Sequence, residues 1–339
     1  MELPRTITVA GPGPGFTFRI RLQNDANPEV VQGILSRLPL ETFCLHVVVA
    51  GETIYMPAPS ISLGSKNMVE RRMGTVYFNT TSQSICFCYG AVTESTKVNQ
   101  FARVLEEDLP NLIDFGKLVY QETISQKLPK IVPISIRLNG SNAPSASPSL
   151  DRQTLTTPIG DWKSVKQIID RKCEQLRRPE EPDEIKKIRL GAVQTLAGGE
   201  SSPFQATIFL QGFLSTLGPH VFSRLLSLSE EPGIDLSLMI RQTKVFLLDT
   251  FDHFKFLNDL GLKGLDSIGA AYEQAFASLE SLDDYRALTD SVRTLIQLYY
   301  RWIHLTFPWY LKSDFPGRTD EEVAALPKLE VYNSAENRI

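Results

Sequence analysis

The sequence predicts an α+β multidomain protein, with a small β-barrel at the N-terminus followed by an all-α helical bundle. Two observations carry this prediction. Apolar and polar residues alternate with a period of two up to about residue 138, as strands require, and recur with a period of 3.6 after about residue 161, as helices require. The chain has 339 residues, 42% hydrophobic and 22% charged, an ordinary composition for a globular protein of two domains.

The first part contains short strand-like runs separated by glycine, proline, asparagine and serine, which favours a closed or nearly closed barrel. Residues 16–22 alternate most clearly. A short helix is expected from Asn27, as its N-cap, to the residue before Pro39. Further strands are expected in residues 42–51, 52–59, 74–90, 99–104 and 131–138, and a second short helix in residues 106–123, lying over the barrel mouth.

Residues 140–160 are rich in proline, serine and threonine and are interpreted as a linker between a barrel, residues 1–139, and a bundle, residues 161–339. Helices are expected in residues 161–178, 184–198, 204–218, 236–260, 264–282 and 283–307. The aromatic end of the last helix is interrupted by Arg301 and His304, which favours a packed core or a subunit interface over a membrane surface.

Charge and hydropathy exclude several classes of partner. A net charge of −4 does not indicate binding to nucleic acid or to an anionic membrane, which attract basic proteins. No apolar run reaches the roughly 18 residues of a membrane span, and the first residues do not resemble a signal peptide. A cytoplasmic protein is therefore expected.

Two short motifs resemble cofactor sites, one a phosphate-binding loop and the other a metal site, but neither is interpreted as one. The glycine-rich residues 10–16 predict a turn, because Pro12 and Pro14 remove two of the N–H donors that a phosphate-binding loop needs. Cys86 and Cys88 lie on one face of a strand, with Phe87 and Tyr89 on the other. We expect these thiols to be small buried hydrophobes, and no metal site.

A resemblance rests on residues 51–59, GETIYMPAP, followed by residues 84–104, SICFCYGAVTESTKVNQFARV. These runs resemble the small bacterial cyclophilin-like barrels, and with the appended helices the whole chain resembles the cucumopine/mikimopine synthases, a class of opine synthase. The resemblance implies condensation of L-histidine with 2-oxoglutarate to an imine, then Pictet–Spengler ring closure. It implies no cofactor.

Such chemistry needs a base for the proton on the imidazole carbon and cations for three substrate carboxylates. Glu52 is the first choice of base, because it follows Gly51 at a strand end where partial burial would raise its pKa; Glu94 is the alternative. Tyr55 and Tyr89 are candidate proton donors or stacking partners.

The candidate substrate-binding residues lie mainly on the strand near residue 100. Asn99, Phe101 and Arg103 are expected to share a face by the period of two, and Lys97 joins them if the strand begins that early. Of the pair Arg71 and Arg72, at most one points into the barrel. Arg72 and Arg103 are preferred as carboxylate ligands. The candidates for substrate binding are His46, Arg72, Lys97, Asn99 and Arg103.

Two rival functions stay open at this point. A cyclophilin-like barrel can bind small anions without catalysis, and the barrel shape alone suggests peptidyl-prolyl isomerase activity. Self-association as a homo-oligomer is expected through the apolar helices, with Tyr299 and Trp302 on the assembly face.

Overall fold

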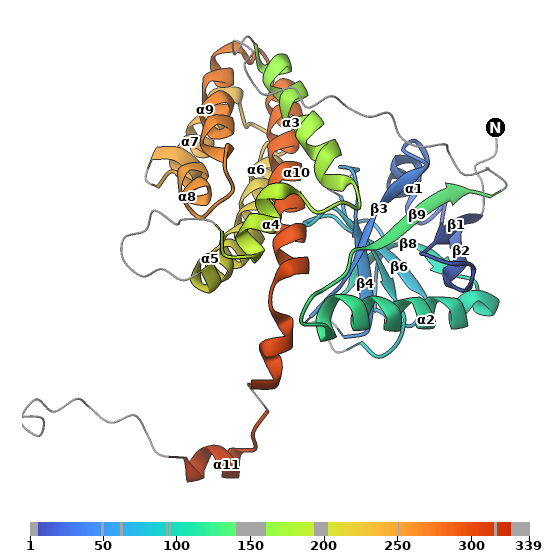
Figure 1. Cartoon of the computed structure of the whole chain (residues 1–339). Coiled ribbons are helices and arrows are strands. Elements are labelled where there is room, and N and C mark those ends of the chain that lie inside the picture. Colours follow the sequence, from blue (N-terminus) through green and yellow to red (C-terminus); the bar gives the residue numbers. More distant parts are fainter. Residues whose placement is uncertain are drawn as a thin grey trace, which may run out of the picture.

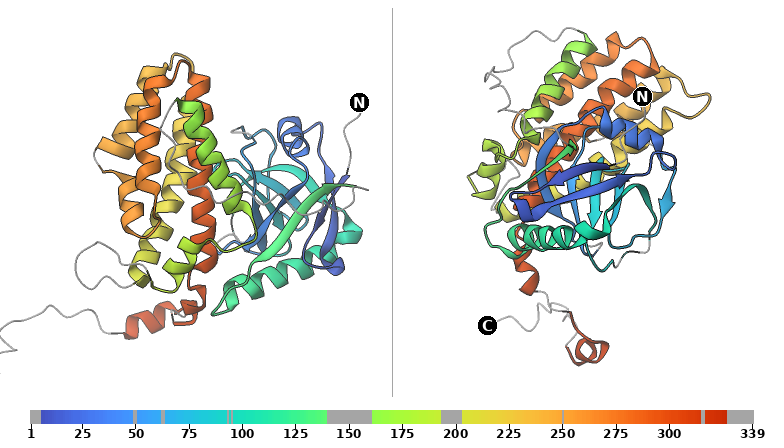
Figure 2. Two further views of the ribbon diagram at one scale, coloured as in Figure 1. Left: turned by 45° about the horizontal axis from the view of Figure 1, so that its top comes forward. Right: turned by 90° about the vertical axis from the view of Figure 1, so that its right-hand side faces the viewer.

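The chain forms a β-barrel packed beside a helical bundle in the computed structural model (Figures 1 and 2). The structure describes residues 6–48, 51–61, 64–92, 94, 96–139, 161–192, 203–249, 251–314 and 317–326. The predicted linker, residues 140–160, and the end of the helix predicted over residues 184–198 lie outside this range.

The barrel strands, within the described residues, are Thr6–Ala10 (β1), Thr17–Leu22 (β2), Leu40–His46 (β3), Thr53–Pro57 (β4), Met68–Val69 (β5), Thr75–Asn79 (β6), Ser84–Cys88 (β7), Val98–Val104 (β8) and Val132–Leu138 (β9). Their order is β2-β1-β9-β3-β4-β7-β6-β8-β5, and β2 also pairs with β8, which closes the barrel. The glycine-rich residues 10–16 form the β1–β2 turn, with a short 3₁₀ turn at Pro14–Phe16, as predicted. Strands β1 and β5 were not predicted.

Two helices close the barrel at opposite ends (Figure 1). Pro28–Leu35 (α1) buries Val30, Val31 and Ile34, and Leu109–Tyr120 (α2) buries Leu112, Phe115 and Val119 in the barrel core. Both helices were predicted. A 3₁₀ turn at Glu106–Asp108 precedes α2, and a π turn at Gln121–Ser125 follows it.

The strands differ in how many of their faces are buried. Strand β2 alternates between buried and exposed residues, whereas β4 and β7 are buried throughout. Cys86 and Cys88 pack in a core shared with the bundle, while Phe87 and Tyr89 pack in the barrel core, so the predicted faces are confirmed. All four cysteines are buried and free, and the described residues contain no cluster that could hold a metal ion.

Strand β8 departs from the predicted alternation. Register with β6 shifts between Val76 and Tyr77, which pair with Ala102 and Gln100 respectively. The β-bulge at Phe101 lets Phe101 and Ala102, neighbours in sequence, both lie in the barrel core. The predicted shared face of Asn99, Phe101 and Arg103 is therefore wrong, because Arg103 is exposed while Asn99 and Phe101 are buried.

The helices of the second part, within the described residues, are Trp162–Arg177 (α3), Asp183–Arg189 (α4), Pro203–Thr216 (α5), Ser223–Leu228 (α6), Leu236–Lys244 (α7), His253–Asp259 (α8), Leu265–Ala275 (α9), Leu282–Thr306 (α10) and Asp320–Ala325 (α11). Leu217–Phe222 (η4) and Val245–Asp249 (η5) are π turns, and Phe276–Ser278 and Trp309–Asp314 are 3₁₀ turns. The single helix predicted over residues 236–260 is broken, since Asp252 caps a new helix by accepting from the Lys255 amide. Helix α6 was not predicted. No described helix combines the length and apolarity needed to cross a membrane.

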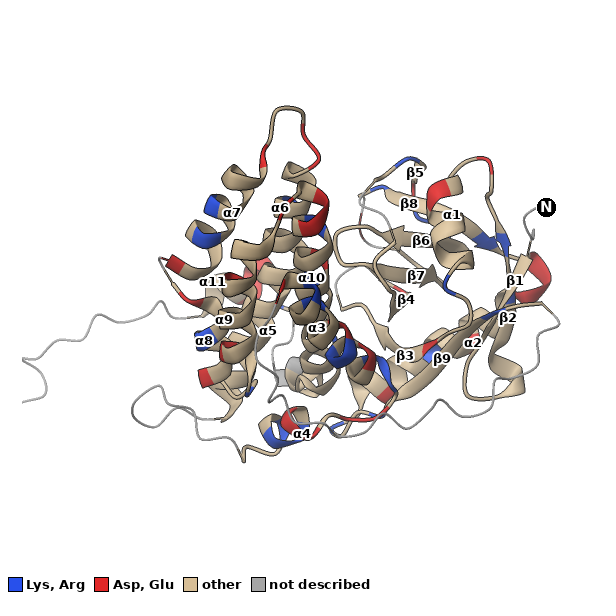
Figure 3. Ribbon diagram, turned by 90° about the horizontal axis from the view of Figure 1, so that it is seen from above, with Lys and Arg blue, Asp and Glu red and all other residues tan. Residues whose placement is uncertain are grey.

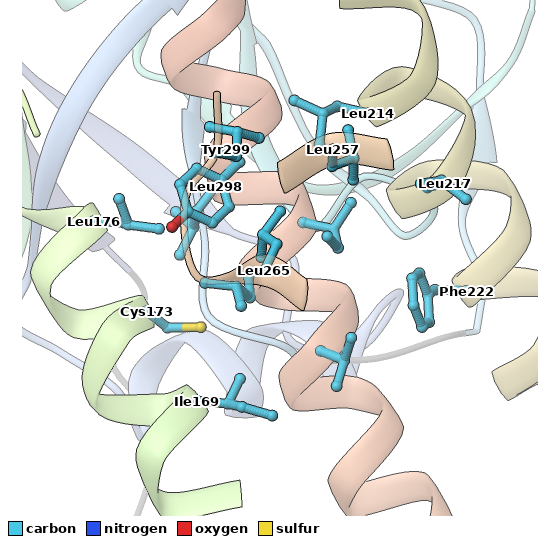
Figure 4. Packing of buried hydrophobic residues seen from close by; sticks show 14 of the residues in the cluster. Ile169, Cys173, Leu176, Leu214, Leu217, Phe222, Leu257, Leu265, Leu298 and Tyr299 are labelled. Atoms are coloured by element: carbon cyan, nitrogen blue, oxygen red, sulfur yellow. The ribbon is translucent and has the colours of Figure 1, made fainter. Parts of the chain in front are cut away.

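Helix α10 is the central element of the bundle. Figure 4 shows Leu298 and Tyr299 of α10 among apolar side chains from α3, α5, α8 and α9. Trp302 is fully buried, and its indole N–H donates to the Leu176 carbonyl at 2.8 Å. Of the two interpretations left open for this segment, the structure shows the packed core, because Tyr299 and Trp302 are buried inside the chain and are not available as the expected assembly face.

The β6–β7 turn anchors the barrel to the bundle. The Thr81 carbonyl accepts from Gln297 Nε2 at 2.9 Å and from Ser223 Oγ at 2.8 Å. Arg301 donates to the Ser82 carbonyl at 3.1 Å and to Ser84 Oγ at 2.7 Å. Gln83 in this turn has a φ of 47°, so the backbone adopts a left-handed conformation that the surrounding contacts must hold. Figure 3 shows α10 on the side of the bundle that faces the barrel.

Candidate active site

A hollow of about 620 Å³, here called the junction pocket, lies between the bundle and the barrel wall formed by strands β4, β6 and β7. Its barrel side includes Tyr55, Arg71, Tyr77, Ser84, Cys86 and Glu94, and its bundle side includes Ser215, His220, Tyr300, Arg301 and His304. The pocket therefore exists only because α10 and η4 cover strands β4, β6 and β7. Polar side chains of both parts converge on it, as is usual for small-molecule sites at domain interfaces.

Arg71 and Glu94 form the charged pair of the pocket. An Arg71 terminal nitrogen lies 2.6 Å from Glu94 Oε2, and its side chain is 7% exposed against 38% for Glu94. The Arg71 guanidinium also lies over the Tyr77 ring, 5.6 Å from its centroid. Arg71 Nε has no hydrogen-bond partner among the described residues. A buried guanidinium nitrogen without an acceptor is costly, so a bound anion would satisfy it.

The hydrogen bond from Arg71 lowers the pKa of the Glu94 carboxyl below its usual range. Glu94 is therefore ionised at neutral pH. A carboxylate that competes for Arg71 would weaken this pair and raise the pKa of Glu94 again. The pair can thus hold a substrate carboxylate and, in the same event, make Glu94 a stronger base.

Arg301 is the second cation of the pocket and comes from the bundle. Its guanidinium lies between two phenol rings, 4.6 Å from the Tyr55 centroid and 5.0 Å from the Tyr300 centroid. The same side chain holds the β6–β7 turn. Burial raises the pKa of Tyr55 well above its ordinary value, so its hydroxyl stays protonated and can donate.

His304 closes the pocket beside these rings as a neutral imidazole. Burial lowers its pKa to about 4. Its Nε2 lies 3.2 Å from the His46 carbonyl, and its Nδ1 lies 3.3 Å from Gln211 Nε2. Because a carbonyl only accepts, the proton sits on Nε2 and Nδ1 accepts from the Gln211 amide.

The structure brings two predicted catalytic residues, Tyr55 and Glu94, into the junction pocket. Glu52 lies elsewhere, in the β3–β4 connection, where it is exposed and accepts from the Ala91 amide at 2.5 Å. Gly90 leaves room for this contact, since a Cβ there would come within 2.1 Å of the Glu52 carboxylate. The expected partial burial of Glu52 is therefore not observed.

Tyr89 and His46 lie on the α2 side of the barrel, with Glu52 near them. The Tyr89 hydroxyl lies 2.9 Å from His46 Nε2, and the His46 ring also contacts Tyr120 with centroids 5.0 Å apart. Burial raises the pKa of Tyr89 to about 12, with the negative charge of Glu52 adding to the effect. None of these three predicted residues lines the junction pocket.

The predicted cations on the outer barrel form a different hollow. Arg72, Lys97 and Arg103 line a cavity of about 400 Å³ with Glu70, and none of these four residues is among those that line the junction pocket. Arg72 is exposed and lies 3.5 Å from Glu70. Asn99 has a structural role, because its amide oxygen accepts from Asn27 Nδ2 at 2.7 Å and from the Asn67 amide at 3.1 Å.

Sequence reasoning missed the bundle residues of the pocket and chose the wrong member of one pair. Arg71 is the arginine that points inward, whereas Arg72 was preferred. Arg301 and His304 were interpreted only as interruptions of an apolar helix, and Tyr300 was not singled out. The available signal was the arginine itself, because a charged residue within an apolar helical face requires a partner.

Comparisons with known proteins agree with this architecture. Residues 165–305 match the family model described as the cucumopine synthase C-terminal helical bundle domain. The structure of McbB in complex with tryptophan is similar at a TM-score of 0.79 and 22% identity, covering 92% of this chain and 100% of that chain. No match is found among curated protein sequences. The predicted barrel-plus-bundle fold is confirmed, and the bundle match supports the resemblance to the cucumopine synthase family.

Proposed function

We propose that the chain is an opine synthase that condenses L-histidine with 2-oxoglutarate and closes a ring by a Pictet–Spengler reaction, without a reducing cofactor. The product is cucumopine or mikimopine. The observation that carries the proposal is the buried Arg71, with an unsatisfied Nε, paired with Glu94 in a pocket lined by phenols. This set combines carboxylate binding and a base in one place.

The pocket binds the substrates through its cations and rings. Arg71 and Arg301 take substrate carboxylates, since a guanidinium presents a planar fork of donors. Tyr55 and Tyr300 offer ring faces against which an imidazole packs. Holding both substrates aligned contributes up to about 7–11 kcal/mol to lowering the barrier.

The reaction then forms one C–N bond and one C–C bond, and needs one positioned base. The α-amine adds to the ketone carbon and water leaves, which gives an imine. The imidazole carbon attacks the imine carbon, and the C=N electron pair moves to nitrogen, which takes up a proton. Glu94 removes the remaining proton from the attacked imidazole carbon, and the ring regains its aromaticity. The Tyr55 hydroxyl donates to the departing water.

The comparisons support this proposal at a coarser level. The bundle matches the helical domain of cucumopine synthases, and McbB binds tryptophan, an amino acid that also carries an aromatic ring. In this proposal the barrel, residues 1–139, supplies the base, and the bundle, residues 161–339, supplies one wall of the site.

A direct assay tests the proposal. Purified full-length chain is incubated with L-histidine and 2-oxoglutarate in buffer with EDTA and without NAD(P)H, and products are detected by mass spectrometry. We expect a product with the summed mass of the substrates minus one water that resists borohydride reduction, because its ring is closed. Strict need for NAD(P)H or for metal would overturn the mechanism. Binding of both substrates without product would instead identify an anion-binding protein.

We propose that the chain forms a homo-oligomer through helix α5 and not through the face around Tyr299 and Trp302. Helix α5 carries no charged residue, and Phe204, Ile208 and Phe209 on it are exposed. Such an uncharged face matches a second copy of itself better than a polar partner. Sedimentation of Phe209→Glu against the wild type tests this, and an unchanged mass counts against the surface.

A further inference from the structure

A second hollow of about 230 Å³ adjoins the junction pocket and is here called the side groove. The two hollows share Thr81, Pro219 and His220, so the groove continues the pocket along the junction of barrel and bundle. Beyond these residues, the groove is lined by Thr80, Ser223, Arg224 and Ser227. Among the described residues that line the groove, Pro219 alone lacks a polar side chain, and none is a carboxylate.

The walls of the side groove are fixed by the contacts that join the two parts of the chain. One wall is the β6–β7 turn, whose Thr81 carbonyl accepts from Ser223 and Gln297. The other wall is the π turn η4 with the start of α6, and π turns inside helices occur frequently at functional sites. Gly218 lets η4 approach α10, since a Cβ there would come within 2.8 Å of Gln297 Cγ.

Arg224 gives the side groove its positive charge. Its side chain is exposed, and within the described part of the chain no carboxylate lies within ion-pairing distance of it. His220, also exposed, lies where the groove opens into the junction pocket and adds an imidazole donor. Hydroxyl groups of Thr80 and Ser227 complete a surface that offers donors and one full cation, which suits a carboxylate.

We propose that the side groove is the subsite for the non-reacting carboxylate of a dicarboxylic keto acid, with Arg224 as the residue that selects it. This inference rests on the proposed function, because it assigns the reacting end of the keto acid to the junction pocket. Arg224 does not line the pocket that holds Arg71 and Glu94, so it would bind the keto acid away from the reacting atoms. If Arg224 holds the keto acid equally in the ground state and the transition state, its loss raises KM for that substrate more than it lowers kcat.

The test compares Arg224→Gln with the wild type and with Arg241→Gln, a matched change at an exposed arginine of α7 outside both hollows. Turnover is measured at saturating L-histidine with 2-oxoglutarate and with pyruvate, which lacks the second carboxylate. We expect Arg224→Gln to raise KM for 2-oxoglutarate by about 10-fold or more, the effect of losing a charge-assisted hydrogen bond. KM for pyruvate in Arg224→Gln should stay within about twofold of the wild type. KM for both keto acids in Arg241→Gln should do the same. Equal losses for both keto acids, or no loss, would overturn the subsite.

A binding arm separates failure of the subsite from failure of the proposed function. Calorimetry with glutarate, which has both carboxylates but no ketone, and with butyrate reports the subsite without any turnover. Weaker glutarate binding in Arg224→Gln, with butyrate unaffected, supports the subsite even if the wild type makes no product, in which case the condensation proposal alone fails. Unchanged glutarate affinity overturns the subsite whether or not product forms.

Discussion

The two walls of the barrel differ in what lies on their outer face. Strands β1, β2 and β9 turn that face to solvent and alternate between buried residues and partly or fully exposed ones, whereas β4, β6 and β7 turn it to the bundle. On the covered wall, Tyr55, Tyr77 and Cys86 point outward from the barrel and yet are buried. The barrel lumen is filled by apolar core, so the polar junction pocket, and the chemistry proposed for it, lie outside the lumen.

Glu94 and Glu52 are carboxylates on different sides of the barrel, and exchanging each in turn gives the largest expected effect. Glu94→Gln removes the carboxylate of the covered wall and should lower kcat by at least about 10²-fold, the lower end for a positioned base, with substrate affinity much less affected. Glu52→Gln changes an exposed carboxylate near the α2 end and should retain turnover within about twofold. Product assays give the rates and calorimetry the affinities. A collapse in Glu52→Gln with normal Glu94→Gln would move the site to the α2 side.

The neighbouring arginines provide a matched pair. Arg71→Gln should raise KM by about 10–100-fold, because it removes a buried charge-assisted contact, while Arg72→Gln changes an exposed side chain and should be nearly silent. Arg71 also holds the pKa of Glu94 down. Its removal should therefore move the acidic limb of kcat/KM to higher pH, since a base with a raised pKa is protonated sooner as pH falls. Equal effects of the two substitutions, or an unmoved limb, would contradict this role.

The sequence predicted the barrel, both barrel helices and most of the bundle, because these follow from local periodicity. It also predicted the opposite faces of Cys86 and Phe87, since a regular strand keeps its period of two. It did not predict which face the bundle covers, and this decides whether Glu94 or Glu52 lies in a pocket. A bulge at Phe101 broke the period that linked Asn99 to Arg103, and Arg301 acquires its partners only through tertiary contacts.

We expect a smaller, pH-dependent effect on stability at the contact between barrel and bundle. His304 of the bundle donates to the His46 carbonyl of the barrel and has its pKa lowered to about 4 by burial. An unfolded histidine titrates near 6.5, so between about pH 6.5 and 4 the unfolded chain binds one more proton than the folded chain at this position. The free energy of unfolding is therefore unaffected by this residue well above pH 6.5. It falls as pH falls, by about 2 kcal/mol at pH 5.

His304→Gln keeps an amide donor for the His46 carbonyl but cannot titrate. Compared with the wild type, the variant should show a shallower loss of unfolding free energy between pH 7 and pH 5, by about 2 kcal/mol, in urea titrations monitored by circular dichroism. His220→Gln is the control, because it removes an exposed imidazole that is hydrated in both states. A parallel pH dependence in His304→Gln and the wild type would show that protonation of His304 does not oppose folding. The imidazole would then not be held neutral where barrel and bundle meet.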